Sequence, residues 1–583
     1  MSAAGLAISN LSTTPASGRG INLVPAALLI AAFLWIPLIT TVISSLQAGS
    51  TWSGANYSSL FGDTFPKILL ATLGDSAAVT LACLFLGVPT AYTLARVEGK
   101  IIAVILFALS IPLFVSSLIR SYSWVAILGN RGLLNQFLLY IGLIERPIKM
   151  AYTQTGMFAA MVQVQLPLFI LPAYSVMRRI DPRVRRAAQS LGADPITAFF
   201  TAFLPLAMPG IGAASLLVFI GSLGFFETPA ILGPPGAYLV SQSIEVRVNS
   251  LGDQGGAAAQ AVVLLLLTVL LLSFTILLRK AVAGLKRSLP FEAPRPRSKI
   301  LLEKIARSAS AWRWMIVGSL TTFVIVLTFL PLIILLPLSL SSASYLSFPP
   351  VGFSFRWFIA FFETDEWTKG TALSIQLAAA AAAIATFAGG LCVLNLGALP
   401  PRARSIALIV ASAPLVISPM VLAVSIFYIS ALLGLIGNPV VFIGTYALMG
   451  LPFPVLIIGA ALTKLDPALL RAAASLGAKP STILKTVTLP LLSASVLSGF
   501  LFSFVVGFND LSVSLFLSSG NTRTLPLLMW DDVRQEITPR LAAVSVVVLT
   551  AGTIFWLLAI TLRHAVARRR ADRLTSAVRA AAT

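Results

Sequence analysis

The sequence contains the segment IDPRVRRAAQSLGADPITAFFTAFLPL at residues 180–206 and repeats it as LDPALLRAAASLGAKPSTILKTVTLPL at residues 465–491. Fifteen of the 27 paired positions are identical, and each copy is a polar island between long apolar runs. One interpretation is a pair of capped connectors without further function. Loops facing solvent are free to vary, however, so their agreement favours an external partner with two equivalent sites.

The composition places this repeat in a membrane protein. Hydrophobic residues make up 57% of the chain, charged residues only 10%, and the mean hydropathy is +0.94. Soluble domains contain about 25% charged residues. A bilayer core requires about 20 apolar residues per helix, and continuous runs of that length are untypical of membrane barrels. The chain is therefore predicted to be an all-α integral membrane protein.

The apolar runs form two sets of six. The predicted spans of the first set are 21–46, 68–95, 101–127, 151–177, 206–227 and 259–280, and those of the second are 313–340, 371–397, 404–434, 439–463, 491–513 and 541–562. The predicted organisation is an N-terminal tail (1–20), a first six-helix domain (21–282), a linker (283–312), a second six-helix domain (313–563) and a basic C-terminal tail (564–583). Six spans per domain place both repeated segments on one face, so the two repeats are parallel.

The distribution of Lys and Arg predicts the orientation. The chain carries a net charge of +21, and most of its basic residues lie in segments that are cytosolic if the N-terminus is cytosolic. The positive-inside rule therefore places both termini and both repeated segments in the cytosol, as parts of a multi-pass protein of a bacterial inner membrane. Because the charge is dispersed over short loops, no nucleic-acid partner is expected.

Each repeated segment has the signals of two short helices joined by a turn. Asp181-Pro182 and Asp466-Pro467 supply a capping side chain followed by a proline in the first turn. Gly192 and Gly477 stand where a helix ends through a left-handed residue. The surface presented to a partner is predicted to comprise small residues, one arginine and one leucine in each copy: Arg186, Ala187, Ala188, Leu191 and Gly192, and Arg471, Ala472, Ala473, Leu476 and Gly477.

Ionisable residues in or near spans are candidates for a solute path, because they are costly in lipid and usually face the bundle interior. Glu227 and Asp510 follow equivalent Gly-Phe-x sequences at similar depth, and Asn509 precedes the second acid. Asp75 is a further candidate without an acidic counterpart. An alternative role for these acids is to cap helices or line the outer mouth of the path.

Aromatic residues near the acids favour a cationic or amine-bearing solute, because aromatic faces attract cations. Tyr122 and Phe225 are the candidates, together with Phe226. Trp124 is expected to be a membrane-interface residue rather than a ligand. Arg120 lies close to Tyr122 in the sequence and carries a positive charge, so an anionic solute stays an alternative.

The sequence does not favour an enzyme. It contains no Gly-x-x-x-x-Gly-Lys-Ser/Thr phosphate loop, so ATP hydrolysis by this chain is not expected. The single histidine, His564, cannot build a His-rich metal site, and no metal or other cofactor is expected to bind. Cys83 and Cys392 lie in apolar runs and are predicted to be buried hydrophobic residues.

The repeated segments resemble the EAA loop of binding-protein-dependent ABC importer permeases, in which Glu-Ala-Ala, three residues, Gly and nine residues precede Ile-x-Leu-Pro. Ala187, Ala188, Gly192, Leu204 and Pro205 match the first copy of the pattern, and the second copy matches at the equivalent positions. The departures are Arg186 and Arg471 for Glu, and Ala202 and Val487 for Ile. The resemblance implies a coupling helix that docks on a cytosolic ATPase subunit.

Other motifs extend this resemblance along the chain. Residues 116–146 and the GFFETPAILG run at 224–233 resemble the first permease of spermidine/putrescine-type systems, and the runs GFSFRWFIAFF (352–362) and GFNDLSVSLFL (507–517) resemble the second. The chain is thus similar to both permeases fused head to tail. The resemblance implies a homodimer of ABC ATPase subunits that binds ATP and Mg, an extracytoplasmic solute-binding protein, and transport by alternating access.

The expected function is therefore ATP-driven import of polyamines or related amine-bearing solutes through loops 181–205 and 466–490. One alternative is a permease of the same class for an anionic or metal-bearing solute, such as ferric iron or an aminophosphonate. Another is a secondary transporter or channel that needs no ATPase.

Overall fold

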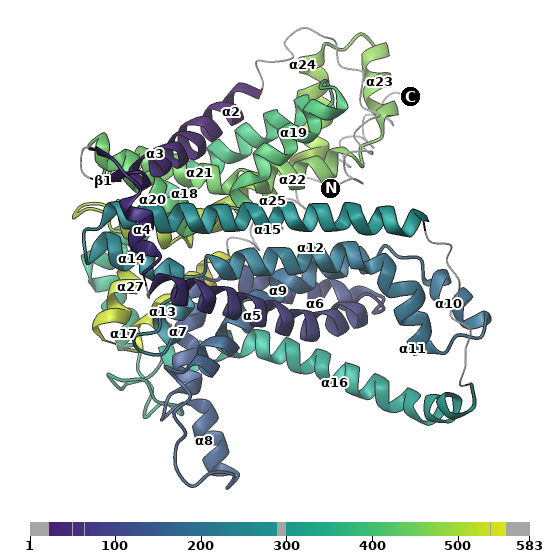
Figure 1. Ribbon diagram of the computed structural model, residues 1–583, viewed down its shortest axis with the longest axis horizontal. Helices are drawn as coiled ribbons and strands as arrows, with labels where there is room; N and C mark the ends of the chain where they lie inside the picture. Colours follow the sequence, from purple (N-terminus) through teal and green to yellow (C-terminus); the bar gives the residue numbers. More distant parts are fainter. Residues whose placement is uncertain (1–22, 49–50, 63, 289–298, 537, 555–583) are drawn as a thin grey trace, which may run out of the picture.

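The computed structural model describes residues 23–48, 51–62, 64–288, 299–536 and 538–554. Nearly all of these residues are helical, and the long helices run side by side along one direction (Figure 1). Among the described residues the only sheet is a short hairpin, in which β1 (Gln47–Ala48) pairs antiparallel with β2 (Thr51–Trp52). The prediction of a helical membrane protein agrees with this architecture.

The first half of the chain contains long α-helices joined by shorter ones, and its short π- and 3₁₀-helices carry the label η. In order the helices are α2 (Val24–Ile30), η3 (Ala31–Trp35), α3 (Ile36–Ser45), α4 (Ala55–Leu60), α5 (Phe65–Leu94), α6 (Lys100–Ser110), η4 (Ile111–Phe114), α7 (Ser117–Leu128), α8 (Leu133–Tyr140), α9 (Gln154–Met177), α10 (Pro182–Ser190), α11 (Pro195–Ala198), η5 (Phe199–Phe203), α12 (Leu204–Leu223), α13 (Glu227–Leu232), α14 (Val240–Asn249) and α15 (Gln254–Ser288).

The second half repeats much of this order. Its helices are α16 (Lys299–Ser339), α17 (Arg356–Glu363), α18 (Asp365–Leu396), α19 (Pro401–Ser412), η6 (Ala413–Leu415), α20 (Pro419–Leu432), α21 (Pro439–Gly450), α22 (Pro452–Leu462), α23 (Pro467–Ser475), α24 (Pro480–Ile483), η7 (Leu484–Thr488), α25 (Leu489–Phe508), α26 (Ser512–Leu517), α27 (Leu525–Gln535) and the helix Arg540–Ile554.

Nine helices of the described residues are long and apolar enough to cross a membrane, and two pairs of bent helices raise this number to eleven. These eleven segments lie at eleven of the twelve predicted spans. The twelfth span, predicted over 541–562, overlaps the helix Arg540–Ile554, beyond which the described residues end.

The third predicted span of each half is not one straight helix. Lys100–Phe114 and Ser117–Tyr140 meet at 96°, and Pro401–Leu415 and Pro419–Leu432 meet at 90°. Each first arm ends in a short 3₁₀-helix with proline in its first turn, Pro112 in η4 and Pro414 in η6. Proline cannot donate a main-chain hydrogen bond and disrupts a continuous helix. Both arms are apolar, so hydropathy alone does not reveal the bends.

The linker predicted over 283–312 is helical in the parts that the structure describes. Helix α15 continues to Ser288 and α16 begins at Lys299. The segment contains several good helix formers (Lys, Arg, Ala and Leu), whereas its prolines are confined to residues 290–296. Residues 289–298 and the predicted terminal tails, 1–20 and 564–583, lie outside the described residues.

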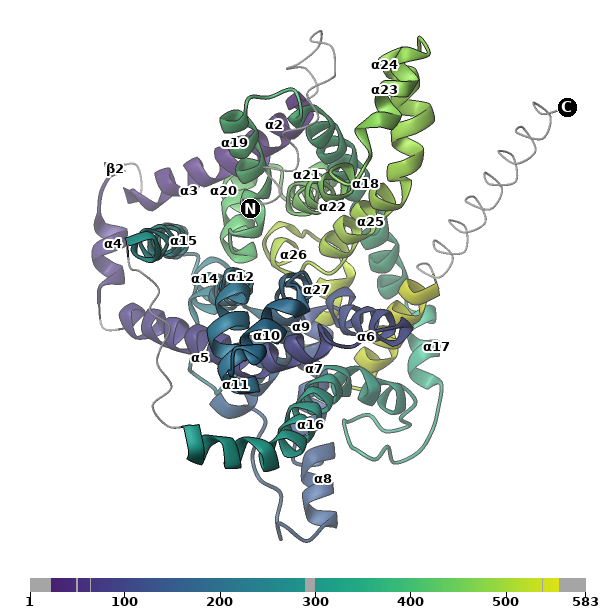
Figure 2. The same ribbon diagram turned by 90° about the vertical axis from the view of Figure 1, so that its right-hand side faces the viewer.

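The first helix of each half packs against the other half. Helices α2 and α3 contact α18, α20 and α21, while α16 contacts α5, α7 and α9 (Figure 2). At one of these crossings Gly444 of α21 lies directly under the Phe33 ring of η3, where a Cβ atom would overlap that ring. The two halves are therefore interlocked rather than placed side by side.

The central helices of the two halves pack in matching groups. Helices α5, α9 and α12 contact one another in the first half, and α18, α22 and α25 do so in the second. Glycines permit the closest approaches: Gly210 of α12 faces Val176 of α9, and Gly499 of α25 faces Pro454 of α22. Close contact between helices supplies the dispersion energy that stabilises bundles in lipid.

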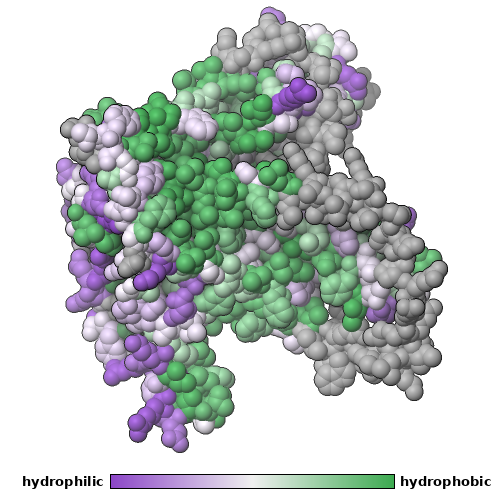
Figure 3. Space-filling view, viewed as in Figure 1, coloured by the Kyte–Doolittle hydropathy of each residue, from purple (hydrophilic) through white to green (hydrophobic). Residues whose placement is uncertain are grey.

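The surface has the polarity expected of a chain in a bilayer. Figure 3 shows a wide hydrophobic band across the middle of the molecule, with hydrophilic residues gathered at the end that carries α4, α14 and α17. In water such a continuous apolar surface would promote aggregation. In a membrane it faces lipid.

Candidate functional site

Glu227 and Asp510 each lie just beyond the end of a long helix, not within it as the predicted spans implied. Helix α12 ends at Leu223 and α25 at Phe508, and the short helices α13 and α26 follow. Gly224 lies at the first break and Gly507 in the last turn before the second. These breaks free main-chain groups, so a carboxylate there has donors to accept from.

The two acids come from different halves and lie within electrostatic range of one another. Asp510 is 8% exposed, and its Oδ2 accepts a hydrogen bond of 2.8 Å from the main-chain nitrogen of Val513, at the start of α26. Glu227 is half-buried and accepts from the side chain of Ser117 in α7. Because like charges repel in a medium of low dielectric, this pair favours a cation between the two carboxylates.

Arg120 partly compensates the negative charge on the first-half side. Its side chain is buried, its Nη1 donates to the carbonyl oxygen of Val164 at 3.2 Å, and it lies within electrostatic range of Glu227. The guanidinium is therefore directed into the first half, between α7 and α9. One arginine against two carboxylates leaves this centre with a formal charge of −1.

The predicted aromatic residues have different positions relative to the acids. Phe225, two residues before Glu227, is half-buried, while Phe226 is buried and its ring centroid lies 5.2 Å from that of Trp530 in α27. The buried Tyr122 donates its hydroxyl hydrogen to the carbonyl oxygen of Thr538 and thereby links the two halves.

Trp124 is enclosed by the protein rather than exposed on its surface. Its side chain is buried, and Nε1 donates to Oε1 of Gln163 in α9 at 3.2 Å. An indole N–H that is buried needs such an acceptor, so Trp124 is a packing residue of the first half. Hydropathy could not reveal this, because α7 is buried on nearly all sides.

Asn509 and Asp75 also differ in their surroundings. Asn509 donates from Nδ2 to the carbonyl oxygen of Phe114 at 3.1 Å, which joins the end of α25 to η4 in the other half. Asp75 of α5 is half-buried and accepts a 2.7 Å hydrogen bond from Nε2 of Gln154 at the start of α9. Asn509 is thus part of the contact between halves, whereas Asp75 is bonded within the first half.

Some residues around the acids were not predicted. Ser117 contacts Glu227, Tyr446 lies within electrostatic range of Asp510, and Trp530 covers Phe226. Ser117 and Arg120 are three residues apart and so share one face of α7, a signal that was available in the sequence. No comparable signal in the sequence pointed to Trp530, because α27 reaches Phe226 only through the tertiary fold.

Charged residues close the end of the molecule beyond the acids. Arg540 contacts Asp532, Arg523 contacts both Glu366 and Asp531, and Arg534 Nη1 lies 3.6 Å from Glu245 Oε1 of the other half. Burial raises the pKa of Asp532, and the Arg540 guanidinium opposes this shift. Asp532 and Glu245 are nearly buried in these pairs, whereas Glu366 and Arg534 are exposed. Ion pairs between exposed side chains contribute little individually.

The repeated loops form matching helix pairs at the opposite end (Figure 1). Asp181 caps α10 by accepting from the main-chain nitrogen of Arg183, and Asp466 caps α23 by accepting from that of Ala468, both at 2.8 Å. Neither helix has a buried residue.

Both helices end in the same way, with a left-handed glycine. Gly192 has a φ of 91° and Gly477 a φ of 78°. The nitrogens of Ala193 and Ala478 then donate to the carbonyl oxygens of Ala188 and Ala473, as in a Schellman motif. These bonds fix the angle at which each loop turns back toward the membrane.

The predicted partner surface has equivalent exposure in the two loops. Leu191 is 90% exposed and Leu476 88%. The arginine, the first alanine and the glycine of each copy are exposed, and the second alanine is half-buried: Arg186, Ala187, Gly192 and Ala188, and Arg471, Ala472, Gly477 and Ala473. Each loop therefore presents one large, almost fully exposed apolar side chain, at equivalent positions in the two copies.

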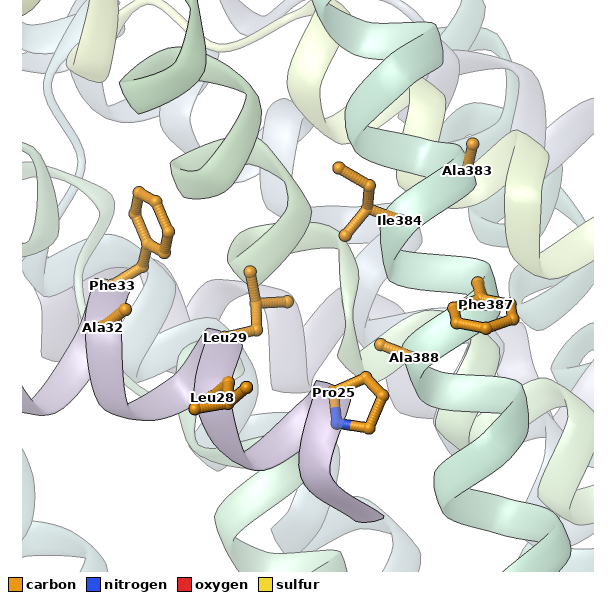
Figure 4. A pocket seen from close by; sticks show the side chains of 9 residues that line it. All are labelled: Pro25, Leu28, Leu29, Ala32, Phe33, Ala383, Ile384, Phe387 and Ala388. Atoms are coloured by element: carbon orange, nitrogen blue, oxygen red, sulfur yellow. The ribbon is translucent and has the colours of Figure 1, made fainter. Parts of the chain in front are cut away.

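A pocket of about 470 Å³ lies away from the acids, between α2 and η3 of the first half and α18 of the second. Figure 4 shows its lining: Pro25, Leu28, Leu29, Ala32, Phe33, Ala383, Ile384, Phe387 and Ala388. All of these side chains are apolar, and Leu28 and Phe387 are exposed. The pocket therefore faces lipid and offers no group that would bind a polar solute.

Comparison with known proteins identifies related membrane components. Residues 396–572 match the family model described as binding-protein-dependent transport system inner membrane component. The spermidine/putrescine transport system permease protein PotB of Escherichia coli is 35% identical over 198 residues, which are 34% of this chain and 72% of the relative.

Two further relatives are permeases as well. The inner membrane ABC transporter permease protein YdcU of Escherichia coli is 32% identical and covered over 69% of its length by 35% of this chain. The spermidine/putrescine transport system permease protein PotC of Haemophilus influenzae is 29% identical and covered over 86% of its length by 38% of this chain. The chain therefore belongs to the family of binding-protein-dependent ABC importer permeases, which are multi-pass inner membrane components of transport systems.

Proposed function

We propose that this chain is the transmembrane permease subunit of an ATP-driven importer for polyamines or related amine-bearing solutes. Two parallel six-helix repeats, 21–282 and 313–563, form the unit, with both termini in the cytosol. The matching order of helices in the two halves and the position of α10 and α23 at the same end of the molecule support this arrangement.

The observation that carries the proposal is the direct connection from each repeated loop to one acid. The first loop continues through η5 and α12 to the break before Glu227, and the second through η7 and α25 to the break before Asp510. A helix transmits displacement along its axis with little deformation. Movement of the two loops therefore changes the separation of the two acids.

The motor in this mechanism is a homodimer of ABC ATPase subunits, which binds ATP and Mg. Leu191 and Leu476 insert into equivalent clefts of the two subunits, and Arg186 and Arg471 lie at the edges of these contacts. Closure of the dimer draws the loops together and opens the path to the outside, where a solute-binding protein delivers its cargo. Hydrolysis reverses the movement.

The acid pair supports a cationic solute. Glu227 and Asp510 come from different halves and lie within electrostatic range of one another, while Arg120 donates to the carbonyl oxygen of Val164 and lies within electrostatic range of Glu227. This centre stabilises an ammonium group and disfavours an anion. The names of the relatives PotB and PotC, spermidine/putrescine permeases, agree with this charge preference.

Reconstitution tests the proposal. The chain is placed in liposomes with its ABC ATPase partner, and ATP-dependent uptake of labelled spermidine and putrescine is measured with the binding protein outside. Ferric iron and an aminophosphonate are tested in parallel as the alternative solutes. Uptake of an amine that requires both ATP and the ATPase supports the proposal, whereas uptake driven by an ion gradient without the ATPase contradicts it.

A further inference from the structure

The segment between α7 and α9, residues 129–153, forms a hairpin that projects from the helix bundle. It contains α8, which runs across the direction of the long helices and lies outside them in both views (Figures 1 and 2). The hairpin lies toward the end of the molecule opposite α10 and α11. We call residues 129–153 the α8 hairpin.

Only the first half has this feature. Helix α7 is joined to α9 by the 25 residues of the hairpin, whereas the equivalent helices of the second half, α20 and α21, are joined by residues 433–438 alone. The second half shows that the bundle can be completed with a short turn. The α8 hairpin is therefore an addition that the helix packing does not require.

The hairpin is held in one conformation by a buried side chain. Asn135 is fully buried, and its Nδ2 donates to the carbonyl oxygens of Gly129 at 3.0 Å and Ile148 at 2.9 Å. Its Oδ1 accepts from the nitrogen of Ile148 at 2.8 Å. At the base, the carbonyl oxygen of Arg131 accepts from the nitrogen of Phe348 in the second half. The position of the hairpin is thus fixed by hydrogen bonds between its outgoing and returning segments and by a hydrogen bond to the second half.

This ordered arm exposes large apolar side chains. Tyr140 is 89% exposed, and Phe137, Ile141 and Leu143 are also exposed. In the returning segment after α8, three charged side chains are exposed as well: Glu145, Arg146 and Lys149. In Figure 3 the protrusion at the bottom is hydrophobic along its right-hand side, toward the middle of the molecule, and hydrophilic along its left-hand and lower side.

We propose that the α8 hairpin is a membrane anchor that lies in the plane of the bilayer at its outer interface. The apolar side is continuous with the hydrophobic band of the spanning helices, which already faces lipid. An amphipathic helix in this position inserts its apolar side chains among the acyl chains and keeps its charges at the headgroups. Tyr140 is suited to this boundary, because its ring is apolar and its hydroxyl is polar.

The occupant of this surface is therefore phospholipid, with Arg146 and Lys149 at the phosphate groups. The assignment to the outer leaflet rests on the orientation in the proposed function. The competing occupant is the solute-binding protein, which approaches the same side of the membrane. The broad lateral reach of the arm away from the acids favours lipid, because a protein delivering solute docks above the path.

A fluorescent probe at Tyr140 distinguishes these occupants. Cys83 and Cys392 are replaced by alanine, and Tyr140→Cys is labelled in the full chain in nanodiscs of phosphatidylethanolamine and phosphatidylglycerol, without binding protein. Quenching by nitroxide-bearing lipids is compared with quenching by aqueous iodide. Ala237→Cys, in the exposed loop between α13 and α14, is the matched control.

The anchor predicts strong lipid quenching and loss of most iodide quenching at Tyr140→Cys relative to Ala237→Cys. Equal iodide quenching at the two positions overturns it, and so does protection that appears only when binding protein is added. Labelling of Ala237→Cys in intact cells by an impermeant thiol reagent tests the orientation separately. Failure of that labelling contradicts the proposed topology but leaves contact of the hairpin with lipid to be judged from the nanodiscs.

Discussion

At the scale of single residues, the acid pair predicts how charge controls transport. Asp510→Asn and Glu227→Gln each remove one negative charge from a centre whose formal charge is −1. Charged hydrogen bonds contribute about 1.5–3 kcal/mol, so the KM for a polyamine is expected to rise by about tenfold or more in each variant. Uptake by proteoliposomes measures the change.

Asp75→Asn is the control for the acid pair. Asp75 bonds to Gln154 within the first half, so its replacement should leave the KM close to that of the parent chain. If Asp75→Asn raises the KM as much as Asp510→Asn, the solute passes along another route. If neither Asp510→Asn nor Glu227→Gln changes uptake, the acids only cap their short helices.

A second prediction at the scale of single residues concerns the hydroxyl group of Tyr122. Its hydroxyl donates to the Thr538 carbonyl oxygen across the two halves, and Tyr122→Phe removes this bond while preserving the ring. A net loss of about 1 kcal/mol shifts the equilibrium between closed and open halves about fivefold. The ATPase activity of the complex without binding protein should rise accordingly. An unchanged activity indicates that this bond persists in both states.

At the scale of elements, the repeated loops show how much the sequence could predict. Their aspartate caps, prolines and glycines specify two short helices with a left-handed turn, and the structure has both in each loop. The helix breaks at Pro112 and Pro414 were missed, because each arm continues the apolar run. The positions of Glu227 and Asp510 beyond their helices were missed for the same reason.

The turn of each loop predicts a graded response to substitution. At Gly192 and Gly477 an added Cβ atom would meet nothing within 4 Å, so the requirement for glycine comes from the backbone angle alone. A valine in the left-handed region costs about 1–2 kcal/mol, whereas asparagine is tolerated there. Gly192→Val and Gly477→Val should therefore uncouple ATP hydrolysis from uptake, and Gly192→Asn and Gly477→Asn should retain most of the coupling.

The measurement for this prediction is the ratio of solute transported to ATP hydrolysed, with insertion into the membrane confirmed by yield. Equal coupling ratios in the valine variants and the parent chain would falsify a role for the loop angle. Equal loss in the valine and asparagine variants would show that the absence of a side chain matters more than the backbone.

At the scale of the whole molecule, the duplication predicted two similar halves but not their interlocking. The sequence marks α2, α3 and α16 as apolar and says nothing of which half they cover. The contact of Phe33 with Gly444 depends on two residues more than 400 positions apart, with no periodic signal that relates them. The same limit applies to the acids: their equivalent motifs indicated a pair, while Ser117, Tyr446 and Trp530 became visible only in the folded chain.

Interlocking predicts that the halves associate without a covalent connection. Residues 1–293 and 294–583, expressed together, should copurify and retain uptake, because α16 packs on the first half and α3 on the second. Affinity capture through a tag on one fragment measures the yield of the other. Recovery of one fragment alone contradicts the prediction, and the uncut chain expressed from the same vector calibrates the yield.

A substitution at Gly444 tests whether its contact with Phe33 holds the halves together. Gly444→Leu places a side chain where the Phe33 ring lies, and overpacking of this kind costs about 1–3 kcal/mol. The yield of the copurified fragments and the melting temperature of the uncut chain should both fall. Gly74→Leu in α5 is the matched control, since nothing lies within 4 Å of a Cβ atom there. Phe33→Ala combined with Gly444→Leu makes room for the new side chain, so partial recovery in the double variant attributes the loss to this one crossing rather than to α21 alone.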